Sequence, residues 1–224
     1  MTFNSDNYIE YELEISRAEA SPVRVLQDAT GAARCGVGST VWDAGLVMAK
    51  YLDHQAQSGE LDLTGKTVLE LGAGTGIVGI SLARLQPKCT VILTDKAELV
   101  PLLKHNVGMN TCENAIAEAL DWCDSGEQQL SGRWSEARPD VILVSDGIWA
   151  SELHKPLADT LSRLAGEHTR VVIGYETRKF DEEAKFVALW SQAFRFRDIK
   201  PGEQHPVMQS EDIYLFEGTK KIGR

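Results

Sequence analysis

The chain has 224 residues, of which 43% are hydrophobic and 25% are charged, and its formal net charge is −10. This composition is typical of a globular protein, and the negative charge argues against nucleic-acid binding, which rests on Lys and Arg at the phosphates. No apolar run reaches the ~18 residues that a membrane span needs, and the polar, acidic N-terminus resembles neither a secretory nor a transit signal. We therefore expect a soluble, cytoplasmic monomer with no membrane or nucleic-acid partner.

The cysteines and histidines form no metal-binding pattern. Cys35, Cys89, Cys112 and Cys123 include no C-x-x-C pair, and the five histidines include no H-E-x-x-H motif. We expect reduced thiols and no metal site.

The beginning of the chain predicts a small β extension. Residues 7–16 and 22–33 are each typical of a short strand bounded by turn residues. We assign residues 1–39 to an N-terminal β extension packed on the core, and residues 40–224 to the main domain.

From residue 40 onward, amphipathic helices alternate with short apolar strands. A helix is predicted over 40–55, with Ser39 or Thr40 as its N-cap. Further strands are predicted at 66–72, 89–95, 115–122, 140–146, 170–176, 194–200 and 212–218, and further helices at 77–85, 97–110, 153–166 and 181–194. The alternation predicts an α/β fold with a mostly parallel sheet and helices on both faces. The last two strands have no helix between them and should pair antiparallel.

The stretch ELGAGTGIVG lies between a predicted strand and a predicted helix, where open α/β sheets bind their ligands. Its GTGIVG part matches the G-x-G-x-x-G pattern of dinucleotide-binding enzymes. The strand ends at Gly72, however, so the register favours G-x-G-x-G through Gly72, Gly74 and Gly76. Gly79 then falls inside the helix, where glycine permits close packing on the sheet.

The charge of this loop also bears on its ligand. Glu70 lies near the loop, and no Lys or Arg occurs between Lys66 and Arg84. A carboxylate without a basic neighbour suits an ammonium group better than a pyrophosphate, and S-adenosylmethionine carries an ammonium, a sulfonium and no phosphate. Asp95 ends the next strand, where an acid accepts hydrogen bonds from ribose hydroxyls or caps the following helix.

Seven segments together resemble the methyltransferase-like 21 family of protein-lysine methyltransferases. They are TVWDAGLVMAKYLD, VLELGAGTGIVG, LTDKAELVPLLKHNVGMN, ALDW, DVILVSDGIW, GYETR and SEDIYLF, in the family's order. The glycine loop alone identifies only the superfamily, whereas the first segment and ALDW narrow the match to the family. The resemblance is nearest to the branch that methylates valosin-containing protein, an AAA ATPase. It implies a Rossmann-like seven-strand methyltransferase sheet with an antiparallel C-terminal strand, and S-adenosylmethionine as the methyl donor.

The resemblance also implies which residues bind the cofactor. Trp42 resembles a cofactor-contacting tryptophan, and Trp122 resembles a residue that lines the adenine pocket, although core packing is the alternative for both. The full set of cofactor-binding residues expected from the match is Trp42, Glu70, Gly72, Gly74, Gly76, Asp95, Trp122 and Ser145.

Three residues are expected to act on the substrate lysine. Asp146 ends a strand beside the glycine loop, where it would orient the lysine or cap the next helix. The family's D-x-x-Y motif reads DGIW here, so Trp149 replaces the tyrosine and keeps its aromatic character. Glu176 ends the following strand, where it would orient the lysine or form a surface ion pair with Arg178. The substrate would be a protein with a target lysine, such as an AAA ATPase or another abundant cytosolic protein.

Other functions stay open on the sequence alone. A methyltransferase for a small molecule or another side chain would share the cofactor loop, and the lost tyrosine motivates a cofactor-binding interaction protein with weak catalysis. Register and charge disfavour an NAD oxidoreductase, and the absence of an N-P-P-Y-like motif disfavours a nucleic-acid methyltransferase. The loops 124–139 and 200–212 are expected to shape substrate choice. The sequence identifies neither the target lysine nor the number of methyl groups added.

Overall fold

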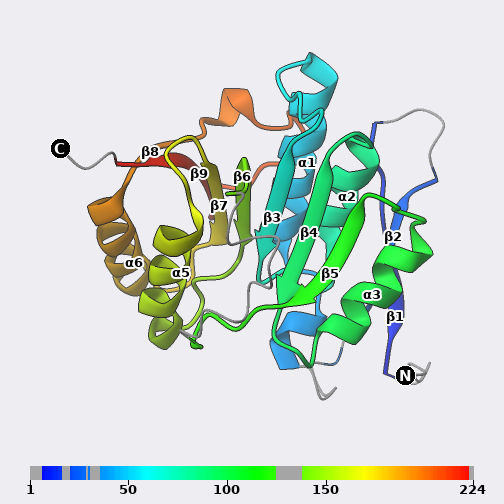
Figure 1. Cartoon of the computed structure of the whole chain (residues 1–224), viewed down its shortest axis with the longest axis horizontal. Coiled ribbons are helices and arrows are strands. Elements are labelled where there is room, and N and C mark those ends of the chain that lie inside the picture. The colour runs from blue at the N-terminus through cyan, green and yellow to red at the C-terminus, as the bar shows by residue number, and fades with distance from the viewer. Residues whose placement is uncertain (1–6, 17–20, 29, 31–35, 125–137, 222–224) are drawn as a thin grey trace.

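The computed structural model describes residues 7–16, 21–28, 30, 36–124 and 138–221. Its centre is a seven-stranded sheet with the order β5-β4-β3-β6-β7-β9-β8, which Figure 1 shows as a twisted layer between helices. The strands are β3 (Thr67–Leu71), β4 (Thr90–Asp95), β5 (Ala115–Ala119), β6 (Val141–Ser145), β7 (Arg170–Glu176), β8 (Phe194–Asp198) and β9 (Ile213–Lys220). Val, Ile and Leu dominate the central strands because a parallel sheet is covered on both faces.

The strand directions confirm the predicted topology. β3 pairs parallel with β4 and β6, and the pairs β4–β5 and β6–β7 are parallel as well. β9 runs antiparallel to both β7 and β8. The chain proceeds outward from β3 to β4 and β5, and then returns to the other side of β3 as β6. The strand order therefore reverses between β3 and β6, and ligands of open α/β sheets bind at the carboxyl ends of strands at such a point.

Helices cover both faces of the sheet (Figure 1). One hydrophobic core lies between the sheet and the first three long helices, and a second lies between the opposite face and the last two. The helices are α1 (Asp43–Ser58), α2 (Ile77–Leu85), α3 (Val100–Met109), α5 (His154–Leu164) and α6 (Phe180–Ala193), with short 3-10 segments η1 (Gly36–Ser39), η3 (Ser151–Leu153) and η4 (Pro201–Glu203).

The expected N-cap of α1 is wrong. The helix begins one residue after Trp42, which occupies the N-cap position without a side-chain capping hydrogen bond. The Ser39 hydroxyl instead donates to the Gly36 carbonyl, and the Thr40 hydroxyl donates to the Asp28 carbonyl. Both hydroxyls are therefore used to fold the segment ahead of the helix.

The first described residues form a separate two-stranded antiparallel sheet. β1 (Ile9–Leu13) pairs with β2 (Val23–Gln27), and β2 lies against α2 and α3. Val23 and Val25 are fully buried and belong to the same hydrophobic core as α1 and α2. This small sheet is thus attached to α2 and α3, the helices that cover one face of the main sheet, while the division of the chain at residue 39 stays a prediction.

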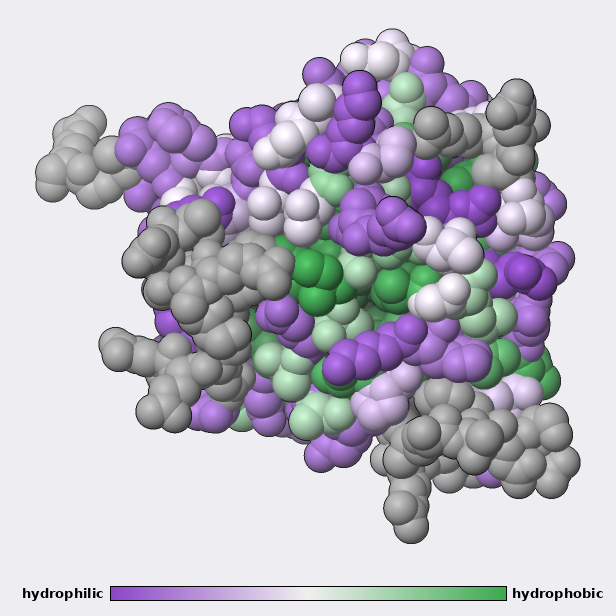
Figure 2. Space-filling view, turned by 45° about the vertical axis from the view of Figure 1, so that its right-hand side comes forward, coloured by the Kyte–Doolittle hydropathy of each residue, from purple (hydrophilic) through white to green (hydrophobic). Residues whose placement is uncertain are grey.

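The surface shows a mixture of polar and apolar areas. In the view of Figure 2, hydrophobic residues gather in the middle of the face, and hydrophilic residues surround them. Within the part of the chain that the structure describes, no helix is both long and apolar enough to cross a membrane. In the same ranges, no group of three or more His, Cys, Asp or Glu side chains is placed to hold a metal ion.

Candidate functional site

The glycine loop follows β3 at the point where the strand order reverses. Gly72, Gly74 and Gly76 have positive φ angles of 68°, 57° and 82°, a region that residues with side chains rarely adopt. Gly79 lies inside α2 and has no positive φ. The backbone of the loop therefore requires glycine at the three positions of the G-x-G-x-G register. Gly79 instead allows α2 to pack closely against Glu70 and Leu93.

Two of the three glycines also give the loop its close contacts. A Cβ atom on Gly74 would lie 2.6 Å from the Gly38 carbonyl oxygen, and one on Gly72 would lie 2.8 Å from the Trp122 ring. Gly76 is the N-cap of α2 and faces core side chains. Gly72 and Gly74 line the cavity described below, but Gly76 does not. Gly76 shapes the turn that leads into α2, and its role in cofactor binding stays a prediction.

Glu70, which the sequence places near the glycine loop, lies in the interior and is not among the residues that line the cavity described below. Its side chain is fully buried, and its Oε2 accepts a hydrogen bond from the Gly79 N–H at 2.9 Å. Burial raises the pKa of this carboxyl to about 8, although the Gly79 hydrogen bond opposes the rise. In this structure the carboxylate contacts the backbone of α2, and the role of Glu70 in cofactor binding stays a prediction.

A cavity of about 660 Å³ opens at the carboxyl ends of the central strands. Its volume falls within the range of roughly 300–1,000 Å³ that is typical of small-ligand sites. All the site residues predicted from the sequence except Glu70 and Gly76 line it, namely Trp42, Gly72, Gly74, Asp95, Trp122, Ser145, Asp146, Trp149 and Glu176. Residues from six separate segments of the chain therefore converge on one cavity.

Asp95 presents a carboxylate to the glycine loop. Its Oδ2 accepts the Gly74 N–H at 2.8 Å, and its Oδ1 accepts the Lys96 N–H at 2.7 Å. Burial raises the pKa of Asp95, and these two hydrogen bonds oppose the rise. The N-cap of α3 is Leu99, so Asp95 is not the cap that the alternative interpretation required. Each carboxylate oxygen has a second lone pair, which leaves Asp95 able to accept a hydroxyl from a ligand.

Three tryptophans supply aromatic surface to the cavity. Trp122 follows β5 and lies against Gly72. Trp42 is 39% exposed, and its indole N–H donates to the Val37 carbonyl at 2.9 Å, which fixes the orientation of the ring. Trp149 is 53% exposed. The cavity can therefore offer ring faces both to a planar base and to a cation.

The two carboxylates expected to orient the substrate lysine share one arginine. The guanidinium of Arg178 donates to the two Asp146 oxygens at 3.1 and 2.9 Å, and to Glu176 at 2.5 Å. The ion pair named as the alternative for Glu176 is therefore present. Asp146 takes part in it as well, which the sequence did not predict.

The turn that carries Arg178 is held by the start of α6. Glu183 accepts hydrogen bonds from the N–H groups of Arg178 and Lys179, at 2.7 and 2.8 Å, and from the Thr177 hydroxyl at 2.5 Å. These contacts position the backbone at the end of β7. The Arg178 side chain is thereby aimed across the cavity, where its guanidinium carbon lies 5.2 Å from the centre of the Trp42 ring.

Comparison with known proteins decides the family. A family model described as lysine methyltransferase matches residues 21–193. The chain belongs to the lysine methyltransferase family. EEF1A lysine methyltransferase 3 of Xenopus tropicalis is 34% identical over 197 residues, which cover 84% of this chain and 77% of that relative. Protein N-lysine methyltransferase METTL21A of Danio rerio is 29% identical over 191 residues, which cover 84% of this chain and 79% of the relative. The resemblance to the methyltransferase-like 21 family is confirmed.

Solved methyltransferases share the fold of this lysine methyltransferase at low sequence identity. The ribosomal protein L11 methylase of Lactobacillus delbrueckii subsp. bulgaricus superposes with a TM-score of 0.56 at 14% identity, over 82% of this chain and 81% of its own. The CurJ carbon methyltransferase superposes with a TM-score of 0.59 at 13% identity, over 80% and 55%. These structures confirm the Rossmann-like methyltransferase sheet.

Sequence reasoning missed two parts of the cavity. Val37 and Gly38 of η1 line it, as does Arg178. Two features of the sequence could have indicated these residues. Gly36 and Gly38 form a pair of glycines shortly before Trp42, and Arg178 is a basic residue two positions after the end of β7. The loop 200–212, expected to shape substrate choice, contributes no residue to the described lining. Most of the loop 124–139 lies outside the described residues.

Proposed function

We propose that this lysine methyltransferase binds S-adenosylmethionine in the 660 Å³ cavity and methylates a lysine of a protein substrate. One observation carries the proposal. The glycine loop, the Asp95 carboxylate and the rings of Trp42 and Trp122 meet in one cavity, at the point where the strand order reverses. The glycine loop and α2 up to Arg84 bring no basic side chain to the cavity, and the basic residues of its lining, Lys96, Arg178 and Lys179, come from other segments.

The residues of the cavity suit the parts of the proposed cofactor. Asp95 can accept ribose hydroxyls while it remains tied to the Gly74 N–H. Trp122 offers a ring face beside Gly72 for the adenine. Trp42 and Ser145 line the same cavity as Asp146 and Glu176, which supports a lysine site next to the cofactor site.

When bound, the cofactor supplies a methyl group whose carbon–sulfur bond breaks as the amine forms its carbon–nitrogen bond, with the bonding electrons left on sulfur. The lysine must react as a neutral amine, although its ordinary pKa is about 10.4. Desolvation of the amine as it enters the cavity lowers that pKa, and the proton can leave to solvent. Asp146 and Glu176 attract and orient the incoming lysine, since alignment of the reacting atoms is a large part of the catalytic effect.

We further propose a cytoplasmic location, a monomer, and an abundant protein substrate. The net charge of −10 supports a basic, lysine-bearing partner. The name of one relative, EEF1A lysine methyltransferase 3, gives EEF1A as the substrate of that relative. An AAA ATPase stays a candidate on the sequence resemblance alone.

Calorimetric titration with S-adenosylmethionine, and with NAD as the parallel control, tests the cofactor assignment. We expect binding of S-adenosylmethionine and no binding of NAD. Binding of NAD alone would overturn the proposal and would return GTGIVG to its dinucleotide interpretation.

A further inference from the structure

We propose that the Arg178 guanidinium occupies the subsite of the substrate's lysine ammonium and must be displaced before the substrate enters. This inference rests on the proposed function, because it identifies what holds the lysine site closed in the free protein. Its ligand class is an alkylammonium group on a protein segment.

The surroundings of the Arg178 guanidinium are those that a lysine ammonium would need. Asp146, with its side chain only 7% exposed, and Glu176 provide carboxylate oxygens on one side. The Trp42 ring provides an aromatic face at 5.2 Å. Carboxylates and aromatic rings are the groups that hold ammonium ions in proteins. All four residues line the proposed methyl-transfer cavity.

The Arg178 guanidinium and the substrate ammonium cannot occupy this subsite together, because both are positively charged. If Arg178 stayed in place, an incoming ammonium would meet a guanidinium that already uses both Asp146 oxygens. If Arg178 leaves, one cation replaces another at the same carboxylates, and the local net charge does not change. The hydrogen bonds to Asp146 raise the pKa of Arg178, so the arginine stays charged and cannot release the carboxylates by losing a proton.

The movement required is small. Glu183 holds the backbone of residues 178 and 179. The Arg178 side chain is 35% exposed, so it already reaches solvent along part of its length. Rotation of this side chain toward solvent would open the subsite, and the backbone of the turn could remain fixed.

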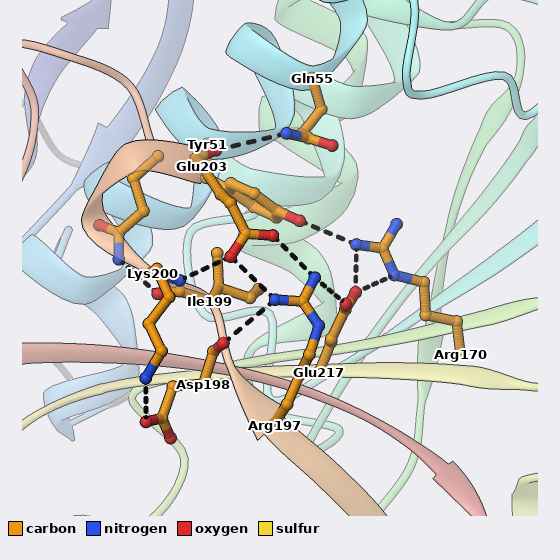
Figure 3. Close-up of polar contacts among 10 residues, drawn as sticks. Tyr51, Gln55, Arg170, Arg197, Asp198, Ile199, Lys200, Glu203 and Glu217 are labelled. Carbon is orange, nitrogen blue, oxygen red and sulfur yellow. Dashed lines mark hydrogen bonds and ion pairs between the residues drawn. The ribbon is translucent and has the colours of Figure 1, made fainter.

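A second arginine with two carboxylates lies outside the cavity and serves as a comparison. Figure 3 shows Arg197 paired with Glu203 of η4 and with Glu217 of β9. Glu217 also pairs with Arg170, so this network ties η4 to the sheet. None of these residues belongs to the described cavity lining. An arginine between two acids is therefore no site by itself, and the cavity and Trp42 distinguish Arg178.

The first test measures binding of n-butylammonium, a mimic of the lysine side chain, without any cofactor. The proteins are the wild type, Arg178→Met and the matched control Arg197→Met, each checked for folding by circular dichroism, and binding is followed by tryptophan fluorescence or NMR. We expect Arg178→Met to bind at least about fivefold more tightly than the wild type, and Arg197→Met to resemble the wild type. Equal affinities for all three proteins would overturn the inference.

The second test makes the protein its own substrate. In Arg178→Lys, an amine replaces the guanidinium in the subsite, where it can lose its proton to water and take the methyl group. Mass spectrometry after incubation with S-adenosylmethionine should find methylation at position 178 and none at the neighbouring Lys179. An unmodified position 178, in a variant that still binds S-adenosylmethionine, would contradict the inference.

The two hypotheses can fail separately. Absence of S-adenosylmethionine binding and of methyl transfer to lysate proteins by the wild type would reject the proposed function, and the inference with it. Methyl transfer by the wild type, combined with wild-type behaviour of Arg178→Met toward n-butylammonium, would reject the inference alone.

Discussion

The Glu70 carboxylate accepts a hydrogen bond from the Gly79 N–H at 2.9 Å, and both residues are buried between β3 and α2. The second oxygen of Glu70, Oε1, has no hydrogen-bond partner among the described residues. A protonated carboxyl suits such a site because it leaves no buried charge unpaired. This contact joins β3 to α2, the strand and the helix on either side of the glycine loop, and so gives Glu70 a part in holding the fold together.

Glu70→Gln should change how stability depends on pH. Glutamate has an ordinary pKa of 4.5, and burial raises the pKa of Glu70 to about 8. Below pH 4.5 the carboxyl is protonated in both states, whereas between these values the unfolded chain releases a proton that the folded protein retains. As the pH rises from 4.5 to about 8, the free energy of unfolding of the wild type should therefore fall by up to about 1.4 kcal/mol per pH unit. The variant should lack this pH-dependent contribution.

Urea unfolding of both proteins at pH 5 and pH 8.5 measures this difference. The variant should gain roughly 2–4 kcal/mol relative to the wild type between the two pH values. Parallel pH dependences would show that Glu70 is ionised in the folded protein.

Gly79→Ala should destabilise the protein, although alanine usually stabilises a helix interior by about 1 kcal/mol relative to glycine. A Cβ atom at Gly79 would overlap the Glu70 carboxylate and lie 2.9 Å from a methyl group of Leu93. Overpacking of this kind costs about 1–3 kcal/mol. Gly108 of α3 is the matched control because no atom lies within 4 Å of a Cβ placed there. Thermal unfolding should show opposite signs for Gly79→Ala and Gly108→Ala, and equal effects would be incompatible with the close packing of α2 on β3.

Trp122→Ala should weaken S-adenosylmethionine binding by roughly tenfold or more, since stacking of a base on an aromatic ring contributes about 1–3 kcal/mol. Trp149→Ala serves as the comparison, because Trp149 lines the same cavity but replaces the tyrosine of the substrate-side motif. Calorimetry should find an affinity within about twofold of the wild type for Trp149→Ala. The assignment of Trp122 to the adenine would be lost if only Trp149→Ala weakened binding.

Asp146→Asn should reduce methyl transfer and leave S-adenosylmethionine affinity unchanged. Asp146 has a positive φ of 52°, which asparagine also tolerates, so the backbone should be preserved. The amide has no charge with which to attract a lysine, and loss of a charged hydrogen bond costs about 1.5–3 kcal/mol, or roughly 10- to 100-fold in rate. Initial rates with tritiated cofactor would measure the change. Full activity would show that Asp146 does not orient the lysine.

The order of strands and helices could be predicted because apolar runs of Val, Ile and Leu end at turn residues, and that signal is local. The glycine loop after the first strand of the main sheet predicted that a ligand site lies at the carboxyl ends of the parallel strands. The Arg178–Asp146 pair could not be predicted, because the partners are 32 residues apart and meet only after β6 and β7 pair. The contact between Glu70 and the Gly79 N–H could not be predicted for a similar reason, since it depends on how closely α2 approaches the strand.

The most direct test of the central claim identifies the amino acid that receives the methyl group. Cell lysate would be incubated with the wild type and S-adenosylmethionine labelled in the methyl group, and the labelled protein would be hydrolysed and its amino acids separated. Asp146→Asn would serve as the control. We expect the label in methylated lysine, and much less of it with the variant. Label in another amino acid or in a small molecule only would contradict the assignment of this chain as a protein-lysine methyltransferase.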